Sequence, residues 1–231
     1  MSTPEPDLTA VVFGAGGGIG AALVSALAAS GRYARIHAGS RSGTEPTDNA
    51  TIHRFAFDLT DEASIAAAAR AIGEPVDLVV VASGVLHDAA HGVAPEKSFR
   101  AIDGEAMARV LAVNTIGPAL IAKHMLPLLP RQRRAVFAAL SARVGSIGDN
   151  RLGGWHSYRA SKAALNMLVA NFAIDLARTR PQAIAVALHP GTVETGLSAP
   201  FSSGVPDDRL FPPRLQRGMP AAGDRRAGER G

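Results

Sequence analysis

Residues 8–30 read LTAVVFGAGGGIGAALVSALAAS, and this stretch decides the fold class of the 231-residue chain. The apolar run at 8–13 is typical of a buried strand, and a helical pattern follows a glycine-rich turn. Such a turn brings backbone N–H groups close to a phosphate at the positive end of a helix dipole. Gly14, Gly18 and Gly20 follow the spacing GxxxGxG, not the GxGxxG of the dinucleotide fingerprint. By itself this spacing fits either a dinucleotide site or a tight turn without a ligand.

The rest of the chain alternates strand and helix patterns. The apolar run VDLVVVA at 76–82 is expected for a strand whose two faces are covered by helices. The alternation predicts an α/β fold, a single Rossmann-type doubly wound parallel sheet with helices on both faces, which binds its ligand at the carboxyl ends of the strands. Beyond 8–13, strands are predicted at 34–39, 52–57, 76–82, 134–140 and 183–189, and helices at 18–30, 61–72, 105–128 and 157–178.

A second motif is the pair Tyr158 and Lys162 in the run HSYRASKAALN. Residues four apart share one face of a helix, and the chain has only two tyrosines and three lysines. A fixed ammonium favours phenolate, so we expect Lys162 to lower the pKa of Tyr158 toward the range useful for acid–base catalysis. The spacing alone is also compatible with two side chains that merely face solvent.

Together these motifs resemble those of the short-chain dehydrogenases/reductases, which carry TGxxxGxG near the N-terminus and YxxxK on a later helix. The similarity covers about residues 8–200, and the wording of residues 141–169 is closer still to the C-factor type and to small carbonyl reductases. The resemblance implies hydride transfer between a nicotinamide and a carbonyl or secondary alcohol. Tyr158 is then the acid/base, Lys162 its cationic partner, and Asn114, in VNTIGP, the holder of a relay water.

The serine of the family's catalytic group has no unambiguous counterpart here. It usually lies three residues before a glycine, and counted back from Gly145 that position is Ala142. Ser141 is immediately adjacent and is the predicted catalytic serine, with Ser146 as the alternative.

Cofactor choice follows from the end of the second strand, IHAGSRS. An acidic residue there would bind the adenosine ribose of NAD, whereas Arg41 can pair with a 2′-phosphate. NADP(H) is therefore favoured over NAD(H), although a solvated arginine at a loop start remains the alternative. The resemblance assigns cofactor binding to Gly14, Gly18, Ile19, Gly20, Arg41, Asp58, Leu59, Gly84, Lys162, Pro190, Gly191, Val193 and Thr195.

The C-terminal segment is unusual. Residues 201–231 are rich in Pro, Gly and Arg and hold no apolar run long enough for a buried strand, so we expect an irregular tail and no seventh strand of the family. The predicted domain is 8–200. Residues 209–231 also account for the whole net charge of +4, which leaves a neutral body and argues against nucleic-acid binding.

Composition narrows the class of protein further. The chain has no cysteine, its histidines lack ligand spacing, and no metal site is predicted. Neither a leader segment nor an apolar run of about 18 residues is recognised, which predicts a cytoplasmic protein without a membrane partner. An apolar stripe on the predicted helix 157–178 suggests a homodimer or homotetramer.

The sequence therefore predicts an NADP(H)-dependent oxidoreductase acting on a small carbonyl compound. The alternative is a C-factor-like signalling protein or NADP(H) sensor with little or no turnover. Retention of Tyr158, Lys162 and Asn114 together favours the enzyme, because a sensor needs no proton donor.

Overall fold

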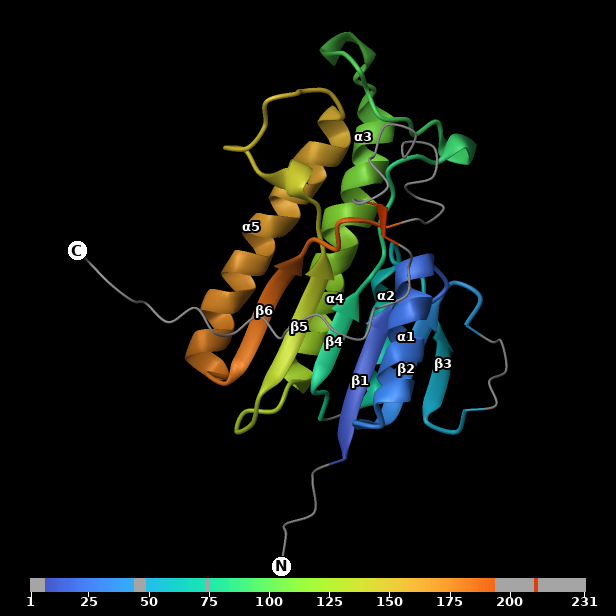
Figure 1. Cartoon of the computed structure of the whole chain (residues 1–231), viewed down its shortest axis with the longest axis vertical. Helices are drawn as coiled ribbons and strands as arrows, with labels where there is room; N and C mark the ends of the chain where they lie inside the picture. Colours follow the sequence, from blue (N-terminus) through green and yellow to red (C-terminus); the bar gives the residue numbers. More distant parts are fainter. Residues whose placement is uncertain (1–6, 44–48, 74, 194–209, 212–231) are drawn as a thin grey trace, which may run out of the picture.

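A six-stranded parallel sheet forms the centre of the molecule (Figure 1). The computed structural model describes residues 7–43, 49–73, 75–193 and 210–211. The strand order β3-β2-β1-β4-β5-β6 reverses direction between β1 and β4, which is where doubly wound sheets bind ligands. All six strands predicted from the sequence are present: β1 (Leu8–Phe13), β2 (Tyr33–Ser40), β3 (Ile52–Ala56), β4 (Leu78–Val81), β5 (Ala135–Leu140) and β6 (Ala183–Leu188).

Helices cover both faces of this sheet, as predicted. The longer helices are α1 (Gly18–Ser30), α2 (Glu62–Ile72), α3 (Gly104–Leu111), α4 (Gly117–Met125) and α5 (His156–Thr179). Short 3₁₀ turns connect them: η1 (Ala89–His91), η2 (Phe99–Ala101), η4 (Leu126–Leu128) and η5 (Arg143–Gly145).

Alternating side chains of each strand supply the two cores. In β1, Val11 and Phe13 belong to the core that α2, α4 and α5 cover, whereas Ala10 and Val12 belong to the core under α1. Leu165 of α5 is 1% exposed and lies in the first core. This packing fixes the rotation of α5 about its axis, and with it the direction in which the other faces of that helix point.

The helix predicted at 105–128 is divided into parts. A π-helical segment, η3 (Ala112–Ile116), separates α3 from α4 and contains Asn114. Such π-bulges are rare and occur often at functional sites. The run Gly104–Leu128 also has the length and mean hydropathy, 1.2, at which a helix can cross a membrane, although the core helix of a globular protein meets the same criterion. Here Ile121, Ala122 and Met125 of this run are fully buried in the core against the sheet.

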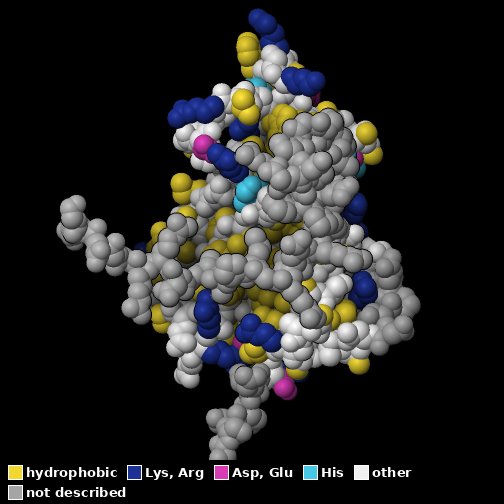
Figure 2. Space-filling model, in the orientation of Figure 1, with side chains coloured by type: hydrophobic (Ala, Val, Ile, Leu, Met, Phe, Trp, Pro, Cys, Tyr) yellow, Lys and Arg dark blue, Asp and Glu magenta, His cyan; other side chains and the backbone are white. Residues whose placement is uncertain are grey.

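The sheet ends at β6 in the part of the chain that the structure describes, in agreement with the predicted lack of a seventh strand. A separate pair of short parallel strands, β7 (Thr192–Val193) and β8 (Leu210–Phe211), follows β6. Strand β8 lies within the segment predicted to be irregular, so that expectation is wrong for these two residues. On the α1 side of β6, Ile184 and Leu188 are 37% and 43% exposed, and Figure 2 shows hydrophobic side chains at the surface over the sheet.

The amino ends of the central strands are held by a buried charge pair. Asp77 accepts hydrogen bonds from Arg133 Nε at 2.6 Å and Nη2 at 3.2 Å, and from the backbone N–H of Thr9 at 3.0 Å. This cluster ties β1 to β4 at the edge opposite the carboxyl ends. It lies at the end of the sheet away from the candidate site.

Candidate active site

Tyr158 and Lys162 lie together on α5, beside the carboxyl end of β5. Both are buried, Tyr158 with 9% and Lys162 with 4% of its surface exposed. The Lys162 Nζ atom lies 5.8 Å from the centre of the Tyr158 ring and donates a hydrogen bond to the carbonyl oxygen of Leu140 at 2.9 Å. The two groups therefore share one face of the helix as predicted, and they do not simply face solvent.

The protonation of this pair differs from the sequence expectation. Burial raises the pKa of the Tyr158 phenol to about 12 and lowers the pKa of the Lys162 amine to about 8. The prediction of a lowered Tyr158 pKa is wrong in this structure, because burial removes the water that would stabilise the phenolate. Near neutral pH the phenol keeps its proton and the amine is mostly charged. The pair is thus poised to donate a proton.

Asn114 is fully buried in the π-helical segment, and its side chain is a bracket between two elements. The Nδ2 group donates to the carbonyl oxygen of Val85 at 2.8 Å and to Ser161 Oγ at 3.1 Å, while Oδ1 accepts the N–H of Val85 at 2.8 Å. These bonds join the segment after β4 to α5. Both amide protons are used within the protein, and a water-holding role of Asn114 stays a prediction.

Gly84 lies at the centre of this arrangement. A Cβ atom at Gly84 would be 3.3 Å from Asn114 Oδ1 and 3.6 Å from Lys162 Nζ. The position therefore brings backbone next to Lys162 without a side chain between them. Glycine at this position therefore has a physical reason.

Ser161 completes the bracket, although no sequence pattern indicated that this residue would be part of the site. Its hydroxyl donates to the carbonyl oxygen of Tyr158 at 2.8 Å, and its own carbonyl accepts Thr115 Oγ1 at 2.9 Å. A helical serine next to Lys162 has no sequence signature for such partners, since these come from a segment more than forty residues away.

Neither candidate serine forms a hydrogen bond with Tyr158 among the described residues. Ser141 donates its hydroxyl to Asn166 Oδ1 at 2.6 Å, and Asn166 lies two turns beyond Tyr158 on α5. Ser146 is exposed and accepts the N–H of Asp149 at 3.3 Å. The Ser141 hydroxyl is thus paired with Asn166, and its role as the serine that assists Tyr158 stays a prediction. The family position itself is Ala142, which has no hydroxyl.

The glycine-rich turn leaves donors free at the start of α1. Gly14 has a φ of 94°, and its added Cβ would meet Ser83 Oγ at 2.7 Å; at Gly20 it would lie 2.1 Å from the Gly14 carbonyl oxygen. Only glycine fits these two positions. The first backbone bond of the helix joins the Ala21 N–H to Gly17, and Gly17 provides no side-chain cap. The N–H groups that precede that bond belong to Gly18, Ile19 and Gly20.

Charged residues gather at the ends of β2 and β3. Arg41 is exposed directly after Ser40, whose Cβ lies 3.4 Å from a Cβ placed on Gly16 of the glycine turn. Hydrogen bonds from Thr60 lower the pKa of Asp58, and the positive charges of Arg109 and Arg41 lower it further. Arg41 and Asp58 are therefore electrostatic neighbours beside the glycine turn.

The remaining residues predicted to contact the cofactor follow β3 and β6. Leu59 packs so tightly on Gly117 that a Cβ there would lie 2.4 Å from Leu59 Cγ. Pro190 and Gly191 follow β6, with Gly191 at a φ of 78°, and Val193 lies in β7. Thr195, also predicted to bind the cofactor, lies outside the described residues.

Comparison with known proteins agrees with this geometry. A model of the short chain dehydrogenase family matches residues 8–205. The chain belongs to this family. The match runs from the glycine turn through the Tyr158–Lys162 pair and beyond β6, so one family description accounts for all of the elements that build the site.

Individual members of the short-chain dehydrogenase family show how far the similarity extends. The C-signal protein of Myxococcus xanthus is 40% identical over 119 residues, which are 51% of this chain and 66% of that protein. A Rhodococcus 1-hydroxy-2-glutathionyl-2-methyl-3-butene dehydrogenase is 36% identical over 144 residues, 62% of this chain and 60% of the relative. The chain thus spans less than two thirds of the length of these curated relatives.

Solved structures of the family superpose over most of the chain. The NADPH-bound carbonyl reductase from chicken fatty liver has a TM-score of 0.73 and 26% identity, covering 89% of this chain and 82% of that one. A Burkholderia multivorans protein with bound NADP has the same TM-score and identity, covering 89% and 86%. The shared fold therefore extends over nearly nine tenths of this chain.

The residues present fit a nicotinamide dinucleotide. Gly14 and Gly20 lie where any side chain would collide with backbone, and the free donors at the start of α1 suit a pyrophosphate. Gly84 keeps the approach to Lys162 open. Glycines and unpaired N–H groups at these positions reduce the stability of the fold, and binding of a ligand would offset that loss. All of them lie at the carboxyl ends of β1 and β4.

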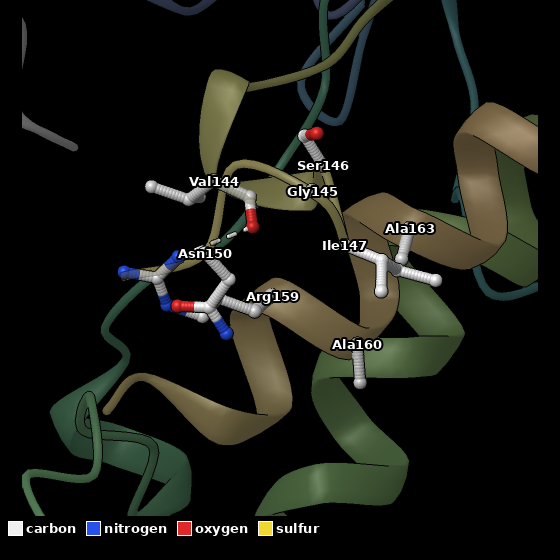
Figure 3. Close-up of a pocket in the computed structure, with 8 residues that line it drawn as sticks. All are labelled: Val144, Gly145, Ser146, Ile147, Asn150, Arg159, Ala160 and Ala163. Carbon is white, nitrogen blue, oxygen red and sulfur yellow. Dashed lines mark hydrogen bonds between the residues drawn. The ribbon is translucent and has the colours of Figure 1, made fainter. Parts of the chain in front are cut away.

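A separate cavity of about 270 Å³ lies beside the first turns of α5 (Figure 3). Arg159 lines it, and this side chain donates to the carbonyl oxygens of Gly154 at 3.0 Å and Val144 at 3.4 Å. Tyr158 and Lys162 are not among the lining residues, so the cavity belongs to a neighbouring face of α5 and not to the catalytic pair. It is lined by Val144, Gly145, Ser146, Ile147, Asn150, Arg159, Ala160 and Ala163.

Proposed function

We propose that this protein is an NADP(H)-dependent oxidoreductase that reduces a small carbonyl compound or oxidises the matching secondary alcohol. The observation that carries the proposal is the buried pair of Tyr158 and Lys162, in which the phenol is protonated and the ammonium lies on the same helix face. The NADPH-bound carbonyl reductase of similar fold supports the substrate class.

The bound cofactor would supply the hydride, and the chain supplies orientation and the proton. Gly18, Ile19 and Gly20 would bind the pyrophosphate through their N–H groups. Lys162 Nζ has donors beyond its bond to Leu140 and would hold a ribose hydroxyl. Asp58 and Leu59 would lie at the adenine, and the segment from Pro190 through Val193 and Thr195 at the carboxamide.

Tyr158 acts on the substrate oxygen. Among the described residues its hydroxyl has no hydrogen-bond partner, so it can donate to a carbonyl oxygen. As the carbonyl carbon accepts hydride, the C=O π bond breaks and the oxygen takes the Tyr158 proton, which yields an alcohol and a phenolate. The charged Lys162 then stabilises that phenolate, and its charge is present below about pH 8. With a pKa of about 12 the phenol is in the protonated form that carbonyl reduction requires near neutral pH.

NADP(H) preference rests on Arg41. No acidic residue occupies the end of β2, and a guanidinium beside the glycine turn can form a charge-assisted bond with a 2′-phosphate. Replacing Arg41 with alanine should weaken NADPH binding about tenfold to a hundredfold and leave NADH binding unchanged. Arg35→Ala, at the start of the same strand, is the matched control. Equal losses for both cofactors would argue against the 2′-phosphate contact.

The test of the reaction is NADPH oxidation with a panel of aldehydes, ketones and quinones. We expect turnover by the wild-type protein and its loss in Tyr158→Phe, with NADPH affinity retained, because the phenylalanine ring keeps the packing and lacks only the proton. Turnover that survives in Tyr158→Phe would show that another group donates the proton.

A C-factor-like sensor is the second candidate, favoured by one observation. The family serine position is Ala142, and the hydroxyl of the nearby Ser141 is bonded to Asn166, so no second donor to a substrate oxygen is identified among the described residues. The 40% identity to C-signal points the same way. Tight NADPH binding without turnover of any substrate in the panel would decide for the sensor.

The assembly and location of the protein are further proposals. Met167 and Ile174 on the outer side of α5 are 64% and 54% exposed, and pairing of two copies of this helix would cover them in a homodimer or homotetramer. Sedimentation equilibrium would test this, and a monomer would refute it. A cytoplasmic location without nucleic-acid or membrane partners stays a prediction from the sequence.

A further inference from the structure

The start of α5 is not capped by its own residues. Trp155 occupies the N-cap position with φ 50° and ψ 45°, and it is the one non-glycine residue of positive φ in the described part of the chain. Its side chain provides no capping hydrogen bond. The N–H groups of the first turn therefore need partners from elsewhere. The catalytic Tyr158 is the third residue of this helix, so whatever holds the first turn also holds the phenol.

Glu96 supplies those partners from the segment between β4 and α3. Its two carboxylate oxygens accept the Ser157 N–H at 3.3 and 3.2 Å, and one of them also accepts the Ser157 hydroxyl. The Glu96 backbone carbonyl accepts the N–H of Trp155 at 2.5 Å. The Glu96 residue is only 7% exposed, and its negative charge lies at the positive end of the helix dipole.

The same contacts set the two aromatic rings against each other. Trp155 and Tyr158 pack edge to face, with ring centres 6.2 Å apart and planes at 76°. Gly154 approaches Glu96 so closely that a Cβ there would lie 3.3 Å from the Glu96 carbonyl oxygen.

This cap differs from the side-chain caps of α2 and α3. Asp61 and Asp103 cap α2 and α3 locally, each accepting an N–H of the helix that it precedes. The cap of α5 is instead a buried carboxylate 61 positions away in sequence, and burying a charge is unfavourable unless it is well paired. A local Ser or Asp would cap a helix equally well. A distant cap additionally fixes the catalytic helix to the segment after β4.

We propose that Glu96 is a positioning residue for the reaction, which holds the first turn of α5 and thereby the orientation of Trp155 and Tyr158. The inference rests on the proposed function, since Tyr158 is taken as the proton donor. Glu96 touches neither substrate nor cofactor in this role and acts through Ser157 and Trp155. Loss of its carboxylate releases the backbone next to the phenol without removing any reacting group.

The test compares Glu96→Gln and Glu96→Asp with Glu62→Gln. Glu62 is a matched control, because this glutamate also has two side-chain partners, Lys123 and His124, but lies at the start of α2. Steady-state NADPH oxidation gives kcat and KM. Near-ultraviolet circular dichroism and fluorescence report on Trp155, which is the single tryptophan of the chain.

For Glu96→Gln we expect kcat to fall about a hundredfold, as for a displacement of about 1 Å, while KM for NADPH stays within about twofold. The Trp155 signal should change in parallel. Glu96→Asp keeps the charge on a shorter side chain and should recover part of the loss in kcat, whereas Glu62→Gln should match wild type throughout. A purely structural role would lower the melting temperature and leave kcat and the Trp155 signal unchanged below it, which would overturn the proposal.

The outcomes separate this inference from the proposed function. A wild-type protein that turns over, with Glu96→Gln equally active, overturns the positioning role only. A wild-type protein with no turnover refutes the proposed function, and the Trp155 signal of Glu96→Gln still decides whether Glu96 fixes the helix start. Should Glu96→Gln fail to fold, Ser157→Ala replaces it, with an expected loss of about threefold to tenfold in kcat and a changed Trp155 signal. Wild-type values for Ser157→Ala would reject the proposal.

Discussion

Replacing Lys162 with methionine should stabilise the cofactor-free protein while abolishing turnover. Burial lowers the pKa of Lys162 from 10.5 to about 8, and one pKa unit corresponds to about 1.4 kcal/mol. Burying the ammonium therefore costs about 3 kcal/mol near neutral pH. Methionine avoids that cost but loses the bond to the Leu140 carbonyl, worth about 1 kcal/mol. A net gain of about 2 kcal/mol in the free energy of unfolding remains, or about 4–8 °C in Tm for a chain of this size.

The stability advantage of Lys162→Met over wild type depends on pH. Below about pH 8 both the folded and the unfolded wild-type chains carry the Lys162 proton, so the full cost is present. Between about 8 and 10.5 only the unfolded chain keeps that proton, and the unfolding free energy of the wild type rises with pH relative to the variant. Above 10.5 the electrostatic cost has vanished. The advantage of Lys162→Met must therefore shrink across this window.

Urea unfolding of both proteins, near neutral pH and above pH 10, measures the effect. Lys123→Met is the control, because Lys123 is exposed on α4 and its side chain is 62% accessible. That variant should show neither the gain at neutral pH nor its loss at high pH. A Lys162→Met protein that is less stable than wild type at neutral pH, or an advantage independent of pH, would refute the reasoning.

Three other predictions concern the Lys162 pKa, the hydrogen bonds of Asn114 and the ion pair of Asp77 with Arg133. The Lys162 pKa of about 8 predicts that kcat/KM for carbonyl reduction falls about tenfold per pH unit above that value, and a steady-state profile that stays flat to about pH 10 would contradict it. Asn114→Leu removes three hydrogen bonds, two with Val85 and one with Ser161, and should cost about 3 kcal/mol in urea unfolding together with most of the turnover; full activity would show that the bracket is dispensable. Asp77→Asn weakens the pair with Arg133 at the opposite edge of the sheet and should cost about 1–3 kcal/mol with kcat unchanged, so a large fall in kcat would refute that separation.

Much of the fold could be predicted because its signals are local. The glycine turn requires residues without a Cβ, and the alternation of apolar runs identified all six strands and their parallel arrangement. The break at Asn114 could not be predicted, because a π-helical segment of five residues is too short to change the apolar pattern of the helices around it. Strand β8 was missed because two residues carry no strand pattern, and their pairing with β7 is a long-range contact.

The sequence identified the key residues of the site, but it did not predict their protonation or all of their contacts. Tyr158 and Lys162 were found because a spacing of four is enough to place two side chains on one helix face. Their pKa values were not, since the charge of a neighbour is visible in a sequence and the depth of burial is not. The hydrogen bond of Ser141 to Asn166 could not be predicted either, because Asn166 belongs to a different element.

An α/β sheet with a dinucleotide-type glycine turn, and a tyrosine and a lysine on one helix, could be predicted from the sequence, because glycine sterics and helix periodicity act over a few neighbouring residues. Three features became visible only in the folded chain: the raised pKa of the buried phenol, the bonds by which Asn114 joins the segment after β4 to α5, and the cap that Glu96 places on α5. Each of these depends on burial or on a contact between residues far apart along the chain, and such quantities exist only once the chain is folded.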